Sequence, residues 1–166
     1  MRALIVSVIL ATTATAAAAL APLANVPTTV TPYCASSVDG PETMICAASQ
    51  GELNRAWNES DLSETSTVLI AILYDNANMD GSAGSWAIYA GAQCTTSVSN
   101  IDYSISDLGS WRDRVSSFQS YGNCATRLWS GTGFGGTAYP SATGWAVSAT
   151  YVGAAFNDKA RSAQFS

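Results

Sequence analysis

The second half of this chain repeats a pattern of aromatic, apolar and glycine residues, and this repeat restricts the possible fold more than any other feature. Residues 73–82 (LYDNANMDGS) align with residues 128–137 (LWSGTGFGGT), 55 positions later. In each copy an aromatic residue is followed five positions later by a large apolar residue, and two positions after that by glycine. These positions are Tyr74, Met79 and Gly81 in the first copy and Trp129, Phe134 and Gly136 in the second. We interpret each copy as a folded-over hairpin, with the ring packed across the turn and the glycine in a backbone conformation that side chains disfavour.

A second element recurs later in each copy, as residues 111–117 (WRDRVSS) and 156–162 (FNDKARS). Its Asp and Ser side chains can hydrogen-bond the backbone of the turn locally. Short apolar or alternating segments surround both elements and are separated by turns rich in Gly and Asn, which predicts about eight short strands. Seven segments are candidates, namely residues 67–74, 85–90, 101–105, 116–121, 125–129, 144–150 and 161–166.

Together the two recurring elements resemble the paired motifs of the βγ-crystallin superfamily. In that superfamily an aromatic-x4-aromatic-x-Gly hairpin is followed by an Asp-x-x-Ser-Ser loop, and the resemblance covers residues 66–166. The chain is also similar to small exported microbial members, which include a metalloproteinase inhibitor and a yeast-killer-toxin-like protein. The resemblance implies an all-β fold in which two Greek-key motifs, residues 66–122 and 123–166, form one sandwich of two four-stranded sheets.

The segment before residue 66 differs from the rest of the chain in composition. Residues 1–19 have the basic start, apolar run and small-x-small ending of a secretory signal peptide. Residues 20–65 form an acidic extension, which begins with a Pro- and Thr-rich tether or propeptide. Within it, Ser49 and Glu52 have the spacing of a capping box, and Leu53 and Trp57 lie one turn apart, which predicts a short helix near residues 50–58.

Composition narrows the functional classes. The chain of 166 residues contains no histidine, has only 11% charged residues and carries a formal charge of −5. It therefore lacks a basic surface for nucleic acid, and histidine-dependent catalytic or metal sites are excluded. We expect a secreted, extracellular monomer that is not an enzyme, and that has no membrane association once the signal is removed.

Four cysteines, Cys34, Cys46, Cys94 and Cys124, fit export to an oxidising compartment. They allow three pairings, and the spacings do not choose between them. We favour Cys34–Cys46 with Cys94–Cys124, because each pair then lies within one region of the chain. The spacings are wrong for a zinc or CxxC redox site.

The resemblance also implies calcium binding, because the superfamily motif Asn/Asp-Asn/Asp-x-x-Ser/Thr-Ser supplies oxygen ligands. In the first copy Arg112 replaces the leading residue, which leaves Asp113 and Ser116 as candidate ligands. In the second copy Arg161 replaces the hydroxyl residue. Arginine only donates hydrogen bonds and repels a cation, so we expect no cofactor, or at most weakly bound Ca²⁺.

Protease inhibition is the leading function that the resemblance implies, through an exposed loop braced by a disulfide. The candidate loop is residues 91–97, centred on Gln93, Cys94 and Thr95. The related inhibitor carries an apolar residue after its cysteine, whereas Thr95 stands there in this chain. The partner is then an extracellular protease or another protein target, which a toxin-like protein would also bind.

Three alternatives stay open. One is an extracellular structural or stress protein with weak or lost calcium binding. Another is a glycan or cell-wall binding domain that uses surface aromatic residues, although aromatic residues at strand positions are more often in the core. Its candidate residues are Trp86, Trp111, Trp129, Trp145, Tyr139 and Tyr151. The third is catalysis by the carboxylate pairs Glu59/Asp61 and Asp75/Asp80, although nothing in the pattern indicates a cleft.

Overall fold

The computed structural model describes residues 33–39 and 43–166, so the expected signal peptide and tether, residues 1–32, lie outside the described part. Strands dominate this part, with two short helices and three 3₁₀ turns. The helices are α1 (Gln50–Asn58) and α2 (Leu62–Thr65), and the turns are η1 (Ala77–Met79), η2 (Gly109–Trp111) and η3 (Thr132–Phe134). The strands are β1 (Tyr33–Ser37), β2 (Met44–Ala47), β3 (Val68–Tyr74), β4 (Ser85–Ala90), β5 (Tyr103–Ile105), β6 (Ser117–Ser120), β7 (Thr126–Trp129), β8 (Ala138–Tyr139), β9 (Ser148–Ala149) and β10 (Ser162–Phe165).

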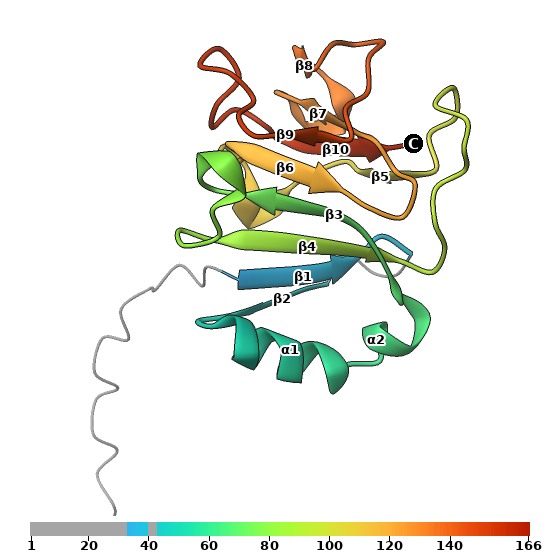
Figure 1. Cartoon of the computed structure of the whole chain (residues 1–166), viewed down its shortest axis with the longest axis vertical. Helices are drawn as coiled ribbons and strands as arrows, with labels where there is room; N and C mark the ends of the chain where they lie inside the picture. Colours follow the sequence, from blue (N-terminus) through green and yellow to red (C-terminus); the bar gives the residue numbers. More distant parts are fainter. Residues whose placement is uncertain (1–32, 40–42) are drawn as a thin grey trace, which may run out of the picture.

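The strands form two sheets whose orders are related (Figure 1). The larger sheet has the order β2-β1-β4-β3-β6-β9, and the smaller has the order β5-β10-β7-β8. The first motif contains β3 to β6, and the second contains β7 to β10. Read from β8, the smaller sheet has the order β8-β7-β10-β5, and the larger sheet contains the equivalent order β4-β3-β6-β9, in which each strand is the counterpart from the other motif. Each motif therefore places its third strand in the other motif's sheet. The predicted all-β sandwich of two Greek-key motifs is confirmed.

The strands predicted after residue 66 are found, most of them shorter than predicted. Residues 85–90 coincide with β4, whereas 144–150 shrink to β9 and β8 was not predicted. Two further strands, β1 and β2, precede residue 66. β1 runs parallel to β4, with Tyr33 opposite Ser85, and pairs antiparallel with β2 on its other side. The sequence YCASS of β1 carries no alternation of apolar and polar residues, so its pairing with a strand about 50 residues away was not predictable from pattern.

Most of the hydrophobic core lies between the two sheets. Alternation along β4 places Trp86 and Ile88 in this core and leaves Ala87 and Tyr89 on the opposite face of the sheet. Other fully buried members of the core are Ile70, Leu73, Leu108, Trp111, Val115, Phe118, Leu128 and Phe165.

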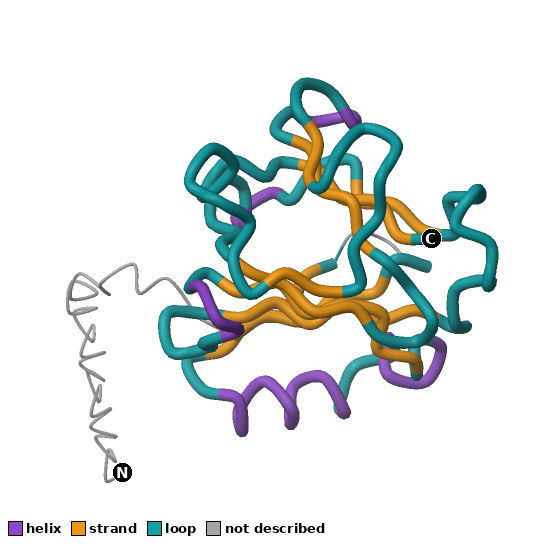
Figure 2. Tube along the Cα trace, turned by 45° about the horizontal axis from the view of Figure 1, so that its top comes forward, coloured by secondary structure: helices purple, strands orange, loops and turns teal. Residues whose placement is uncertain are grey.

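Helix α1 covers the outer face of the larger sheet, on the side opposite the smaller sheet (Figure 2). The predicted helix is found at residues 50–58, and the Ser49 hydroxyl caps it by accepting a hydrogen bond from the Glu52 backbone N–H at 3.3 Å, which is one half of the predicted capping box. Leu53 and Trp57 are both buried against the sheet, as their spacing predicted. Within the described part, no helix has the length and hydropathy needed to cross a bilayer.

Candidate functional site

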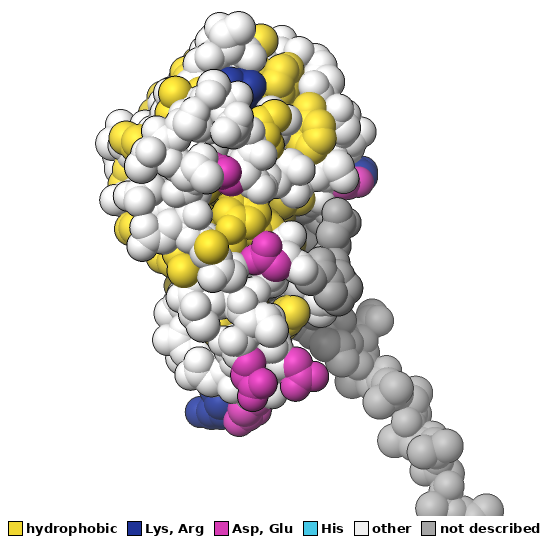
Figure 3. Space-filling model, turned by 90° about the vertical axis from the view of Figure 1, so that its right-hand side faces the viewer, with side chains coloured by type: hydrophobic (Ala, Val, Ile, Leu, Met, Phe, Trp, Pro, Cys, Tyr) yellow, Lys and Arg dark blue, Asp and Glu magenta, His cyan; other side chains and the backbone are white. Residues whose placement is uncertain are grey.

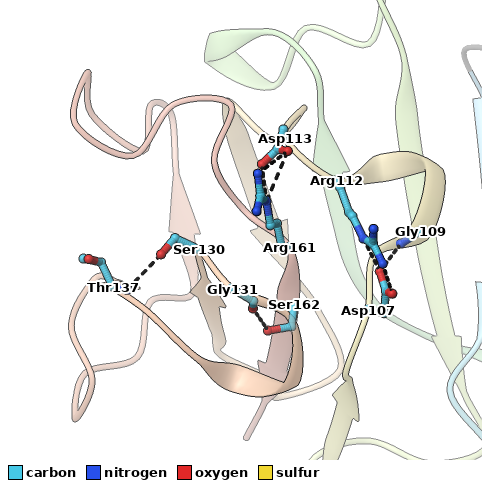
Figure 4. A network of polar contacts seen from close by, with 9 residues as sticks. All are labelled: Asp107, Gly109, Arg112, Asp113, Ser130, Gly131, Thr137, Arg161 and Ser162. Atoms are coloured by element: carbon cyan, nitrogen blue, oxygen red, sulfur yellow. Dashed lines mark hydrogen bonds and ion pairs between the residues drawn. The ribbon is translucent and has the colours of Figure 1, made fainter.

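Each folded hairpin is closed by a buried serine hydroxyl from the last strand of its own motif. The Ser117 hydroxyl donates to the Asn76 carbonyl at 2.6 Å and accepts from the Met79 N–H at 3.0 Å. Ser162 repeats this arrangement in the second motif, donating to the Gly131 carbonyl at 2.7 Å (Figure 4) and accepting from the Phe134 N–H at 3.1 Å. Both serines are fully buried. These bonds span 28 to 41 residues, so the expectation of a local contact was wrong, because the strands rather than the turn bring the serines in.

The aromatic residues that begin the hairpins occupy equivalent places in the two sheets. Tyr74 is paired with Ser117 at the end of β3, and Trp129 is paired with Ser162 at the end of β7. The Trp129 indole N–H donates to Gln164 Oε1 at 2.9 Å. Burial, together with the neighbouring Tyr121, raises the pKa of the Tyr74 hydroxyl. The repeat seen in the sequence is therefore also a repeat in the strand ladders.

The left-handed backbone of the hairpins lies earlier than the sequence predicted. Asn78 and Met79 have φ of 62° and 59°, and Gly133 and Phe134 have φ of 61° and 64°. Gly136 has φ of 77°, as expected for a position that favours glycine. Gly81 is not among the positive-φ residues of the described part, so that half of the glycine prediction was wrong. Both hairpins share the earlier left-handed pair, which in the first hairpin begins at Asn78, a residue type that tolerates this conformation.

The two glycines provide a matched pair of substitutions. Gly136→Ala is expected to lower the free energy of unfolding by about 1–2 kcal/mol, because of its positive φ and because a Cβ there lies 2.5 Å from the Ser130 hydroxyl. Gly81→Ala is expected to change it by less than about 0.5 kcal/mol, since the nearest atoms to its Cβ are 3.9 Å away. Urea unfolding of both variants measures the difference. Equal losses would contradict this account of the hairpin.

In the two loops implied by the resemblance to bind calcium, each aspartate faces the other motif. Asp113 and Asp158 both have a left-handed backbone, with φ of 58° and 55°. Asp113 forms a two-pronged ion pair with Arg161 at 2.9 Å (Figure 4), and this pairing raises the pKa of the arginine. The Ser116 hydroxyl donates to Asp158 at 3.4 Å, so each of the two predicted ligands, Asp113 and Ser116, already has a partner in the other motif.

This arrangement does not fit a calcium ion at Asp113. The guanidinium of Arg161 already satisfies both carboxylate oxygens, and Arg112 is held next to it by Asp107 (Figure 4). At the second loop the Asp158 carboxylate accepts from Asn157 and Ser116, and it is the only acidic group in these contacts. Across residues 33–39 and 43–166, no three His, Cys, Asp or Glu side chains gather as a metal centre.

Replacing the arginine tests whether it excludes calcium. Arg161→Ser frees the Asp113 carboxylate and supplies the hydroxyl that the superfamily motif has at this position. We expect millimolar Ca²⁺ to raise the Tm of this variant by a few degrees and to leave the unmodified protein unchanged, since a ligand of the folded state stabilises it. Lys159→Ser removes the same charge from the loop and is the control. Calorimetry that detects no Ca²⁺ binding by the Arg161 variant would contradict the prediction.

The loop of residues 91–102 joins β4 to β5, and its backbone is fixed at several points. The Cys94–Cys124 disulfide anchors it, and the Cys94 N–H donates to the Gly122 carbonyl at 2.9 Å. The predicted pairing of all four cysteines is confirmed, since Cys34 and Cys46 form the other disulfide. Asp102 closes the loop by accepting from both the N–H of Thr95, at 2.9 Å, and its hydroxyl, at 3.2 Å.

Further contacts hold the loop against three other segments. The Asn123 amide donates to the side chain of Gln93 at 2.8 Å. Asp39, from the segment after β1, accepts from the Gly91 N–H. The C-terminal Ser166 hydroxyl donates to the Ser97 carbonyl at 3.2 Å. The sequence predicted the Cys94–Cys124 bridge but not the partners of Gln93 and Thr95, because Asn123 and Asp102 belong to no recognisable motif.

Although its backbone is fixed, the loop exposes most of its side chains. Cys94 is buried, while Gln93 and Thr95 on either side of it are exposed. Val98 and Ile101 are 60% and 51% exposed, and they are two of the four exposed large hydrophobic residues in the described part. Figure 3 views the molecule from the side on which this loop projects in Figure 1. On this face, hydrophobic patches lie among uncharged side chains, and acidic side chains gather at the lower end.

The other candidate sites are less well assembled. Asp75 is bound to Arg114 at 2.8 Å, and hydrogen bonds from Ser82 lower the pKa of Asp80, the opposite of what a general acid needs. The aromatic residues proposed as a platform do not share one surface, since Trp86 and Trp111 are buried in the core and Tyr151 is 45% exposed.

Comparisons with known proteins find no matching family model and no curated relative. Solved structures of a βγ-crystallin domain from Clostridium beijerinckii are similar at low identity. One single-residue mutant of that domain matches with a TM-score of 0.41 and 19% identity, and a second mutant with 0.39 and 18%; each match covers 58% of this chain and 95% of that chain. The domain without these mutations matches with 0.37 and 16% over the same shares. The fold assignment rests on this chain's own strand order and paired hairpins, which define an all-β sandwich of two Greek-key motifs.

Proposed function

We propose that this protein is a secreted, non-enzymatic binding module that docks residues 91–102 onto an extracellular protein partner, with a peptidase as the first candidate. The observation that carries the proposal is a loop with a fixed backbone and exposed side chains. Such a loop loses little conformational freedom on docking, so more of its contact energy contributes to affinity. The two disulfides support an oxidising, extracellular location.

The exposed side chains of the loop indicate the chemistry of the partner. Val98 and Ile101 present apolar surface next to the hydroxyl and amide groups of the loop. An apolar contact surrounded by polar groups is the usual composition of a protein–protein interface. Thr95 follows the disulfide-bonded cysteine, and its hydroxyl is already engaged by Asp102. The apolar anchors of this loop are therefore Val98 and Ile101 rather than the residue after the cysteine.

Titration of peptidases tests the proposal directly. The oxidised protein is incubated with a thermolysin-like metallopeptidase and with a subtilisin-like serine peptidase, and the residual rate on a small peptide substrate is measured. We expect one of the two rates to fall in proportion to the added protein. Unchanged rates for both enzymes at a stoichiometric ratio would overturn peptidase inhibition.

Two valines give a matched comparison within this test. Val98 lies in the loop and is 60% exposed, whereas Val147 lies outside it and is 67% exposed. Val98→Asp is expected to weaken inhibition at least about tenfold, because it buries a charge in the interface, while Val147→Asp leaves inhibition unchanged. Equal effects of the two substitutions would show that the loop is not the docking element.

A further inference from the structure

A groove lies between helix α1 and the outer face of the larger sheet, separate from the loop of residues 91–102. It has a volume of about 160 Å³. The helix supplies Gln50, Leu53, Asn54, Trp57 and Asn58, and the sheet supplies Ala35, Ala87 and Tyr89. The extension before residue 66 thus builds a concave surface that the two Greek-key motifs by themselves lack.

None of the side chains that line the groove is charged. Gln50, Asn54 and Asn58 follow one another at four-residue intervals, so their amides form a row along one face of the helix. The Gln50 amide donates to Asn54 Oδ1 at 2.9 Å, which orients both side chains, and all three residues are exposed. The row offers both donors and acceptors to a ligand without net charge.

Aromatic rings form the inner part of the groove. Trp57 and Tyr89 are stacked, with ring centroids 4.7 Å apart and planes 25° apart. Trp57 is almost fully buried, while Tyr89 is half-buried and keeps part of its surface open. The groove therefore joins the partly open ring of Tyr89 to a row of neutral polar groups.

We propose that this groove binds a neutral carbohydrate, at the scale of one or two hexose or N-acetylhexosamine units. A pyranose ring combines an apolar C–H face, which packs on aromatic rings, with hydroxyl groups that both donate and accept hydrogen bonds. A phosphate or carboxylate ligand has no cationic side chain to pair with in this groove. The row of three amides makes the groove equally unsuited to a purely apolar ligand.

Calorimetric titration of the full oxidised chain with three trisaccharides tests the proposal. Two probes are neutral, chitotriose and laminaritriose, and the third is the charged trigalacturonic acid. We expect at least one neutral trisaccharide to bind, to shift the indole N–H resonance of Trp57, and to bind more tightly than the charged one. Absence of heat with both neutral probes at millimolar concentration would overturn the proposal, as would equal binding of the charged probe.

Substitutions on α1 locate the binding. The double variant Asn54→Ala/Asn58→Ala is expected to fold normally, because both positions are exposed and alanine favours helix, and to bind the neutral trisaccharide at least about tenfold more weakly. Arg55→Ala changes an exposed residue of the same helix that does not line the groove, and it is expected to bind like the unmodified protein. Unweakened binding by the double variant would place the sugar elsewhere and refute the assignment of this groove.

Discussion

Replacing Ser117 with alanine is expected to lower the free energy of unfolding by about 2–4 kcal/mol and the Tm by roughly 10 °C. The substitution removes one fully buried hydroxyl and leaves two part-buried backbone groups, the Asn76 carbonyl and the Met79 N–H, without their partner. Each unsatisfied buried group costs about 1–3 kcal/mol. Urea unfolding followed by tryptophan fluorescence measures the loss.

The second motif supplies an internal replicate of this experiment. Ser162→Ala should cost about as much, because Ser162 makes the same two bonds to Gly131 and Phe134. The double variant should show nearly additive losses, since the two serines share no bonding partner. Ser148→Ala, at an exposed position of β9, is the control and should have little effect. A loss at only one of the two buried serines would contradict the equivalence of the motifs.

Removing the Cys94–Cys124 disulfide by double substitution to alanine is expected to cost about 3–4 kcal/mol and also to abolish most of the binding by residues 91–102. The bridge closes a segment with a sequence separation of 30, and its loss enlarges the conformational freedom of the unfolded chain. In the folded protein, loss of the bridge also frees the loop of residues 91–102, so the loop must lose conformational freedom when it docks. Thermal unfolding measures the first effect and peptidase titration the second.

Removing the other disulfide distinguishes a loss of stability from a loss of binding. Loss of Cys34–Cys46, with a sequence separation of 12, should cost about 3 kcal/mol but leave inhibition intact at temperatures where the protein stays folded. If the variants that lack either disulfide lose inhibition equally while they are still folded, binding does not depend on the Cys94–Cys124 anchor of the loop. If neither loses it, the docking surface lies outside residues 91–102.

Local patterns in the sequence predicted much of the fold. The run of apolar residues in β3 and the alternation in β5 identified strands, because the period of side-chain orientation is a property of a few consecutive residues. The capping box of α1 was equally local. Gly136 has the positive φ that the pattern predicted, whereas Gly81 does not, although both hairpins bend at equivalent pairs, Asn78/Met79 and Gly133/Phe134.

The candidate sites were less predictable, because their partners lie far apart in the chain. Arg161 was recognised as unsuited to calcium, but nothing in the sequence indicated that its guanidinium would pair with Asp113, 48 residues away. Asp102 and Asn123 brace the predicted loop through side chains that belong to no motif. The groove next to Tyr89 needs a helix packed against a strand more than 30 residues later.

The sequence by itself therefore determined the repeated hairpins, the position of most strands and the helix of the extension, since each depends on neighbouring residues. Only the tertiary structure decided that each motif places its third strand in the other sheet, that β1 adds to β4 in parallel, and that Ser117 and Ser162 close the hairpins. The physical reason is that these contacts depend on how distant strands are paired, and many pairings satisfy the same local pattern until the core between the sheets selects one.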